Sequence, residues 1–212
     1  MVQITPTSRG DERKREILRA AAEVFRRRGL HAAGMRDIAA ELGMAVGNLY
    51  YYFESKQALL AFVQEDALDG LIDLADGTRS GAERADRRLF RLLAGHVVLL
   101  NESVPGSLAH LEVEALKGKH GAQIRERRRT YETAVQQIIA DGVEAGVFRP
   151  VDPKVASYAM LGAVNWTVKW FRQGGNKSAG EIGRECAELL VRGLLARGVE
   201  PDFPPPSRGA EA

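Results

Sequence analysis

A short stretch near the N-terminus, residues 45–52 (AVGNLYYY), carries small side chains, one amide and three phenols. Val46, Leu49 and Phe53 recur there at three- and four-residue steps, so a helix would turn them inward. The outward residues are then Ala45, Gly47, Asn48, Tyr51 and one of Tyr50 or Tyr52. An outward amide can pair with an adenine edge, phenols can bond phosphate, and small residues permit close approach. The stretch therefore predicts a helix that enters a DNA major groove.

Two preceding helices must position this one. Residues 35–42 place their apolar side chains on one face, and Gly43 ends that helix because glycine tolerates a left-handed backbone. A longer amphipathic helix before it ends at about Arg28. Residues 9–28 hold eight lysines and arginines against four acids, an excess that suits phosphate contact. We expect residues 1–54 to form a three-helix, DNA-binding head containing a helix-turn-helix.

These motifs resemble a known family. The matching strings are FRRRGL at 25–30, MRDIA at 35–39, LGM at 42–44 and GNLYYYFESK at 47–56. Over residues 10–60 the chain is similar to the DNA-binding region of TetR-family bacterial transcriptional regulators. The resemblance implies DNA contacts from Arg36, Ala45, Val46, Gly47, Asn48, Tyr50, Tyr51 and Lys56. In the family, the lysine at the position of Lys56 contacts a phosphate.

The chain departs from the family pattern at two helix starts. The family often has a hydroxyl residue where Ala33 and Gly34 stand, and a serine followed by a basic residue where Ala45 and Val46 stand. Replacing an N-cap by alanine typically costs about 1 kcal/mol, and by glycine much less. The fold should survive, but these positions supply fewer contacts to DNA, and which groups replace them stays open.

Composition bounds the remaining possibilities. The chain has 212 residues, a net charge of +2 and one cysteine, Cys186, so it has no internal disulfide framework. A single thiol suits a reducing compartment, and residues 1–10 lack the apolar core of a signal peptide, so we expect a cytoplasmic protein. No apolar run reaches the ~20 residues of a membrane span.

The rest of the chain shows helical periodicity and no strand pattern, so we expect an all-α protein of nine helices. Six of them should form a ligand-binding and dimerisation body, residues 55–198. Their expected ranges are 55–76, 82–104, 107–116, 122–145, 152–172 and 178–198. Asp152-Pro153 and Ser178 with Glu181 are predicted helix starts. Residues 199–212 are rich in proline and are expected to be a disordered tail.

The last two helices indicate a homodimer. Residues 152–172 are apolar around most of the circumference, which is typical of a helix buried on several sides. In the TetR family the last two helices form a four-helix bundle with a twofold mate. Two heads about 34 Å apart would then read a palindromic operator in double-stranded DNA. The alternative, that this face belongs to a monomer's own core, stays open.

A second cluster points to a small-molecule effector. Trp166 and Trp170 lie one turn apart, with Lys169 and Arg172 beside them. They form either an amphipathic ligand wall, or ordinary core and dimer contacts. More weakly, the body resembles a TetR-family subgroup that senses acyl-coenzyme A. The supporting segments are LEVE at 111–114, the basic start of the helix at 122–145, RPVDP at 149–153 and the Asn-Trp cluster before Gly174-Gly175.

That resemblance implies an acyl chain among the body helices and phosphates held by arginines such as Arg125, Arg128 or Arg172. His96 lies on an apolar stripe, and is either a further ligand contact or a hydrogen-bonded core residue. Ligand binding would tilt the helix at 55–76 and change the separation of the two heads.

Catalysis and metal binding have little support. His31, His96, His110 and His120 have no zinc-like spacing with one another or with Cys186. Neither a Gly-rich phosphate loop nor a serine nucleophile elbow occurs. We therefore expect no enzyme, no metal and no cofactor beyond an acyl-coenzyme A or other hydrophobic effector.

The leading hypothesis is a ligand-responsive repressor of fatty acid, steroid or similar catabolic genes. One alternative is a regulator of efflux or detoxification that answers to a hydrophobic drug-like ligand. Another is a helical ligand-binding protein without DNA binding, whose support is the missing hydroxyls at Ala33 and Ala45.

Overall fold

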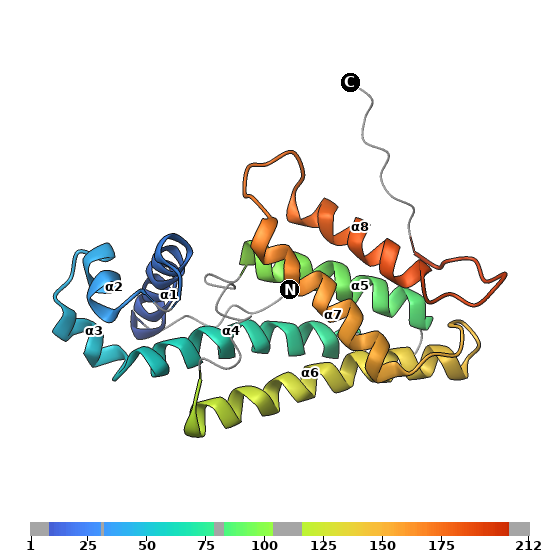
Figure 1. Ribbon diagram of the computed structural model, residues 1–212, viewed down its shortest axis with the longest axis horizontal. Helices are drawn as coiled ribbons and strands as arrows, with labels where there is room; N and C mark the ends of the chain where they lie inside the picture. The colour runs from blue at the N-terminus through green and yellow to red at the C-terminus, as the bar shows by residue number, and fades with distance from the viewer. Residues whose placement is uncertain (1–8, 31, 79–82, 104–115, 204–212) are drawn as a thin grey trace. The chain divides into compact units, whose positions relative to one another are not determined.

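A computed structural model describes residues 9–30, 32–78, 83–103 and 116–203. Within these ranges the chain is all-α, as expected, with eight α-helices and one π-helical turn, η1 (Figure 1). The elements are α1 Arg9–Arg28, α2 Met35–Glu41, α3 Val46–Tyr52, α4 Lys56–Asp76, α5 Ala85–Val98, η1 Leu99–Ser103, α6 Gly118–Glu144, α7 Pro153–Trp170 and α8 Ala179–Arg192. The expected helix at 107–116 lies almost wholly outside the described residues, and Leu116 is not helical.

The chain divides into two compact units. Unit 1 comprises Met1–Asp66 and Pro105–Arg125, and unit 2 comprises Ala67–Val104 and Glu126–Ala212. The division falls inside α4 and α6, so each of these helices contributes residues to both units.

The core of unit 1 includes the apolar faces of α1, α2 and α3. α1 buries one apolar stripe, as its amphipathic sequence predicts: Ile17, Leu18, Ala21, Val24 and Phe25. Ile38 of α2 and Leu49 of α3 are fully buried. Gly43, with φ of +62°, makes the turn between α2 and α3 that residues with a Cβ rarely adopt.

The helix starts of unit 2 follow the sequence closely. Asp152 caps α7 by accepting from the backbone N–H groups of Lys154 and Val155, with Pro153 in the first turn. Ser178 and Glu181 form a reciprocal capping box at α8. Both predicted starts are confirmed.

Three predicted boundaries are wrong. The helix predicted at 82–104 is α-helical only over Ala85–Val98 and then widens into η1. The helix predicted from 122 begins at Gly118, so Gly121 lies inside it. Glycine is required at position 121 because a Cβ there would come 2.4 Å from the Leu116 carbonyl oxygen. The last helix ends at Arg192 rather than 198.

The segment after α8 folds back on unit 2. Leu195 forms an isolated antiparallel bridge with Phe148, and the Phe203 ring stacks on Phe90 at 4.6 Å between centroids. The backbone N–H of Asp202 donates to the buried carboxylate of Asp86 at 2.8 Å. The expected tail is therefore ordered over residues 199–203, because an aromatic side chain and a backbone donor both find partners, and its remainder lies outside the described residues.

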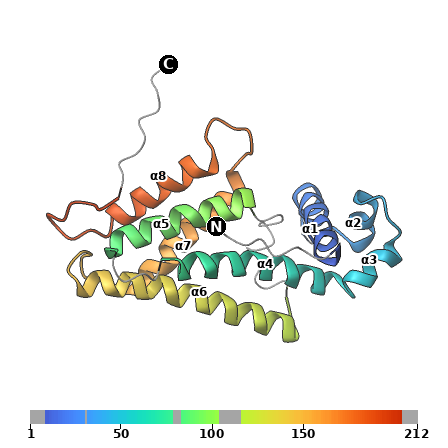
Figure 2. The same ribbon diagram turned by 180° about the vertical axis from the view of Figure 1, so that it is seen from behind.

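In unit 2, α5, α7 and α8 lie side by side, and both views show α8 running along α5 (Figures 1 and 2). Glycines permit this close packing. A Cβ at Gly183 of α8 would lie 2.6 Å from the Ala94 carbonyl oxygen of α5. A Cβ at Gly95 of α5 would lie 2.9 Å from Cδ1 of Leu74 in α4. These contacts fix α5 against its neighbours with little room for adjustment.

Candidate functional site

The outward face of α3 is as the spacing predicted. Tyr51 is 85% exposed and Asn48 is exposed, whereas Leu49 is fully buried and Phe53 nearly so. Ala45, Gly47 and Tyr50 are also exposed, and Val46 and Tyr52 are half-buried. Tyr50 rather than Tyr52 is thus the more accessible second phenol. The ring of Tyr52 packs edge-on to that of Tyr51, with centroids 5.3 Å apart.

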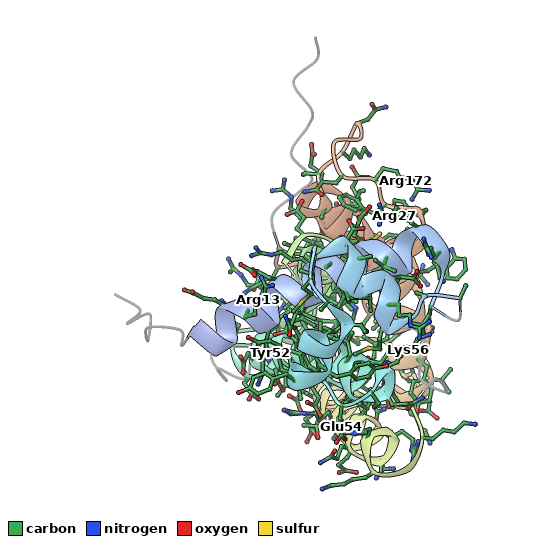
Figure 3. All side chains as sticks on the ribbon, turned by 90° about the vertical axis from the view of Figure 1, so that its left-hand side faces the viewer. Arg13, Arg27, Tyr52, Glu54, Lys56 and Arg172 are labelled. Carbon is green, nitrogen blue, oxygen red and sulfur yellow. The ribbon has the colours of Figure 1, made fainter. Side chains whose placement is uncertain are left out.

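Ion pairs link the basic end of α1 to α2. Arg28 pairs with Asp37, and Arg27 pairs with Glu41 and more distantly with Glu23. Figure 3 looks towards this part of unit 1 with Arg13 and Arg27 labelled. The local cationic excess of the sequence is therefore partly neutralised inside unit 1, while Arg36 of α2 remains exposed.

Lys56 has a structural bond in this chain. Its Nζ donates to the carbonyl oxygen of Leu30, which ties the first residue of α4 to the loop after α1. Burial lowers the pKa of the Lys56 ammonium, and the nearby Asp37 carboxylate opposes that shift. This bond holds Lys56 against the α1–α2 loop of unit 1.

The starts of α2 and α3 both lack the hydroxyl residue that the family often has, and only α2 has a side chain in compensation. At α2 the N-cap is Gly34, whose backbone N–H donates to the Asp37 carboxylate at 2.8 Å. This is the returning half of a capping box, supplied without an N-cap side chain. At α3 the N-cap is Ala45, which makes no side-chain cap bond. Asp37 thus compensates at α2, and no side chain does so at α3.

A buried polar network lies in unit 2. The Nδ1 of His96 is 2.9 Å from the Tyr131 hydroxyl, and its Nε2 is 3.0 Å from Oδ1 of Asn165. Because Oδ1 can only accept, Nε2 carries the hydrogen, and the Tyr131 hydroxyl then donates to Nδ1. His96 is therefore a core histidine with both ring nitrogens bonded, one of the two outcomes left open by the sequence.

Burial sets the protonation of this network. It lowers the pKa of His96 to about 4, opposed by the Asn165 bond, so the imidazole is neutral at neutral pH. Burial also raises the pKa of the Tyr131 phenol far above its usual range. The network is therefore a set of neutral hydrogen-bonding groups that joins α5, α6 and α7.

The arginines that the sequence singled out lie in different settings. Arg125 is exposed and belongs to unit 1. Arg128 belongs to unit 2, where burial lowers its pKa to about 10 against the opposing charge of Glu132. The Arg172 guanidinium is exposed and donates to the carbonyl oxygens of Lys169 and Phe171. The three arginines therefore differ in unit, in burial and in hydrogen-bond partners.

The two tryptophans do not line the interior of this chain. Trp166 is 60% and Trp170 is 46% exposed on α7, and Lys169 between them is exposed as well. Asn165 and Thr167, which flank Trp166, bond inward to residues of the α5–η1 segment. The side of α7 that carries Trp166 is thus opposite the side that faces His96. The exposed apolar residues of α7 and α8 are Val155, Tyr158, Trp166, Trp170 and Leu189.

One groove in unit 2 is lined by none of the residues that the sequence predicted to bind ligand. Its volume is about 620 Å³, and it is lined by Ala75, Arg88, Glu126, Arg129, Thr130, Thr133, Ala134, Gln137 and Ile138. Tyr131 and Asn101 could not be predicted from the sequence, because their partners His96 and Thr167 lie far away in the chain and local periodicity carries no signal for them.

Among the residues that the structure describes, no group of three or more His, Cys, Asp or Glu residues is arranged to hold a metal ion. Over the same residues, every helix is too short or too polar to cross a bilayer.

Transcriptional regulators of known sequence or structure are similar to most of this chain. The KstR2 transcriptional repressor of Mycobacterium tuberculosis is 28% identical over 195 residues, which span 89% of this chain and 96% of KstR2. The solved TetR-family regulator PfmR of Thermus thermophilus is 31% identical with a TM-score of 0.76, covering 85% of this chain and 99% of PfmR. AibR, solved with isovaleryl coenzyme A and operator DNA, is 25% identical with a TM-score of 0.73, covering 86% of this chain and 98% of AibR.

Two family models match in tandem. Residues 17–63 match the bacterial regulatory proteins of the tetR family, and residues 82–194 match the tetracyclin repressor-like C-terminal domain. The second match alone spans more than half of the chain. The relatives are transcriptional repressors and regulators rather than enzymes. The chain belongs to the tetR family of bacterial regulatory proteins and is a transcriptional regulator.

Proposed function

We propose that this regulator is a homodimeric repressor that binds a palindromic operator and is released from it by an acyl-coenzyme A-like effector. The main support for DNA binding by α3 is that this helix has one buried face and one exposed face. Leu49 is fully buried, while Asn48 and Tyr51 project to solvent with small residues around them. A helix buried on one side and free on the other can insert into a major groove without unfolding its support.

The contacts on DNA divide into two kinds. Asn48 is the residue for direct base reading, since its amide can bond N6 and N7 of adenine in a bidentate pair. The exposed side chains of Tyr50, Tyr51 and Arg36 would contact the sugar-phosphate backbone, which fixes register. Lys56 would join them only by exchanging its bond to the Leu30 carbonyl oxygen for a phosphate. Ala45, Val46 and Gly47 let the backbone of α3 approach the base pairs.

The exposed apolar face of α7 and α8 supports a dimer. Trp166, Val155 and Leu189 are each at least 60% exposed, and Gly162 and Ala163 are exposed between them. A patch of this kind marks an interaction surface. A twofold mate would cover it, and two reading helices would then meet half-sites one turn of DNA apart.

Two relatives and the apolar core of unit 2 support this class of effector. AibR binds isovaleryl coenzyme A in its solved complex, and KstR2 is a repressor that covers nearly the whole chain. The interior of unit 2 is largely apolar, which suits an acyl chain, while its polar groups His96, Tyr131 and Asn165 already bond one another. The target genes would serve breakdown of fatty acids, steroids or similar acyl compounds in the cytoplasm.

Operator binding is tested by fluorescence anisotropy on DNA from upstream of the protein's own gene. The Asn48→Ala, Tyr51→Ala double variant should bind at least about tenfold more weakly, because a bidentate base contact alone contributes about 1–3 kcal/mol. Gln123→Ala, which removes an exposed amide from α6, is the matched control and should bind like the wild type. Unchanged binding by the double variant would exclude α3 as the reading helix.

Effector binding is tested separately with isovaleryl and octanoyl coenzyme A, and with free coenzyme A as the control. A ligand at about 100 times its Kd stabilises the fold by about 2.7 kcal/mol, which raises Tm by several degrees. The acyl compounds should raise Tm and release DNA. If neither does so while a hydrophobic cation that does not intercalate into DNA, such as tetraphenylphosphonium, does both, the acyl-coenzyme A assignment is wrong.

A further inference from the structure

The end of α5 departs from regular helix where it meets three other elements of unit 2. After Val98 the chain continues as the π-helical turn η1, Leu99–Ser103. Single π turns within a helix are uncommon and often occur at functional sites, since they place one more residue in a turn than an α-helix holds. The turn begins three residues after His96, so it directly follows the buried polar network.

Asn101 holds this turn in its present register. Its Nδ2 donates to the carbonyl oxygen of Val97 at 2.8 Å. In an α-helix the Val97 oxygen is the acceptor for the backbone N–H of residue 101, so the amide of Asn101 bonds the oxygen to which an α register would bind its own backbone. The second hydrogen of Nδ2 goes to Oγ1 of Thr167 at 2.8 Å, and Thr167 in turn donates to the carbonyl oxygen of Val164. Every donor in this chain of bonds has an acceptor.

The turn also contacts the other helices. The Leu99 side chain occupies the space over Gly70 of α4, where a Cβ would come within 2.7 Å of its Cδ1. The Glu102 carboxylate accepts from the backbone N–H of Ala179, the first residue of α8, at 3.1 Å. One five-residue turn thus joins α4, α7 and α8.

We propose that η1 is the conformational switch of unit 2, that Asn101 is the residue that sets its register, and that the effector acts by shifting η1 between the π and α registers. This inference rests on the proposed ligand-responsive repressor. Returning the turn to the α register moves the following residues about 100° around the helix axis. That movement breaks the Asn101–Thr167 and Glu102–Ala179 bonds together.

The consequence reaches DNA through α4, α7 and α8. α4 begins in unit 1 and ends in unit 2, where Leu99 lies over Gly70. α7 and α8 carry the exposed face proposed for the twofold mate. A register change in η1 therefore alters the contacts of all three helices at once, which is the two-state element that coupling between distant sites requires.

The test compares two variants that each remove a buried hydrogen bond at the same place. Asn101→Leu removes both bonds of the amide and frees the register. Thr167→Val removes the acceptor on α7 but keeps the Asn101–Val97 bond, so the register is retained. Anisotropy on the upstream DNA, thermal unfolding and a crystal structure are recorded for both.

Asn101→Leu should weaken DNA binding by about tenfold or more, within the usual range of coupling between two sites. Its crystal structure should show residues 99–103 in the α register. Thr167→Val should lose as much thermal stability yet bind DNA within about threefold of the wild type. Equal effects in the two variants, or unchanged or tighter binding by Asn101→Leu, would overturn the switch.

Failure of the proposed function can be distinguished from failure of the switch, because DNA binding by the wild type tests the proposed function alone. If the wild type does not bind the upstream DNA, the repressor proposal fails for that operator, and the switch is judged by the crystal structure alone. A π turn retained in Asn101→Leu then overturns it. An α turn with Leu99 displaced from Gly70 supports it.

Discussion

The Nε2 atom of His96 lies 3.0 Å from Oδ1 of Asn165, joining α5 to α7 across 69 positions of chain. The other ring nitrogen meets Tyr131 of α6, so one imidazole links three helices of unit 2. Both bonds require a neutral ring with hydrogen on Nε2. The core of unit 2 is therefore tied to a particular protonation state, and stability must follow pH.

His96 should make the protein less stable as pH falls. Burial lowers its pKa from 6.5 to about 4, so below about pH 6.5 the unfolded chain takes up a proton that the folded chain does not. The stabilisation is complete above that pH and is lost as pH falls towards about 4. Between about pH 7 and about pH 4.5 the wild type should lose about 2–3 kcal/mol more than His96→Gln.

Urea unfolding at several pH values measures this difference. Tyr131→Phe is the control, because it weakens the network but keeps the imidazole buried, so its stability should still fall with pH. A His96→Gln variant that loses stability as steeply as the wild type would show that another group is responsible.

Tyr131→Phe should be destabilising at neutral pH. The hydroxyl donates to Nδ1 of His96, and both groups are buried, so the substitution leaves a buried acceptor without its donor. A loss of this kind costs about 1–3 kcal/mol. Thr130→Val is the neighbouring control, since Thr130 is exposed and its hydroxyl bonds the Glu126 carbonyl oxygen of its own helix. Urea midpoints that shift equally in both variants would contradict the buried network.

Two glycines one turn apart on α8 should respond in opposite ways to alanine. A Cβ at Gly183 would come 2.6 Å from the Ala94 carbonyl oxygen, and a backbone atom of α5 cannot rotate away. Gly183→Ala should therefore destabilise by about 1–3 kcal/mol through overpacking. At Gly180 the nearest atom is 3.9 Å away, so Gly180→Ala should be neutral or stabilise by up to about 1 kcal/mol through helix propensity. Thermal unfolding of the two variants measures this difference. Equal shifts in Tm would refute the close α5–α8 contact.

The exposed apolar face of α7 and α8 should be required for self-association. Trp166→Glu combined with Leu189→Arg places charges at side chains that are 60% and 75% exposed, so folding should be little affected. Light scattering should then give the monomer mass of 23.2 kDa, with DNA binding lost. Glu144→Arg, an exposed change on α6, is the control and should leave the wild-type mass. A double variant that remains a dimer would place the interface elsewhere.

Much of unit 1 could be predicted from the sequence because its signals are local. The spacing of Val46, Leu49 and Phe53 decides which side of α3 faces inward, and Gly43 marks the turn before it. The same holds for the caps at Asp152 and Ser178, which depend on residues within three positions. Local pattern is sufficient where a structure depends on near neighbours in the chain.

Tertiary structure alone decided the partners of polar residues in unit 2. Periodicity placed His96 on the buried side of α5, but its two partners lie 35 and 69 positions away. In the π turn, Asn101 donates to Thr167 across 66 positions, and no repeat in the sequence predicts that bond. The tail was misjudged for a similar reason, since Phe203 is ordered by Phe90.

The sequence by itself determined that α7 is apolar around most of its circumference. Separate motifs in it indicated the family and the helix that we propose to enter the groove. Only the tertiary structure decided that Trp166 points outward while Asn165 bonds to His96 and Thr167 to η1. The physical reason is that hydrophobicity reports how strongly a side chain avoids water, and not which surface will cover it.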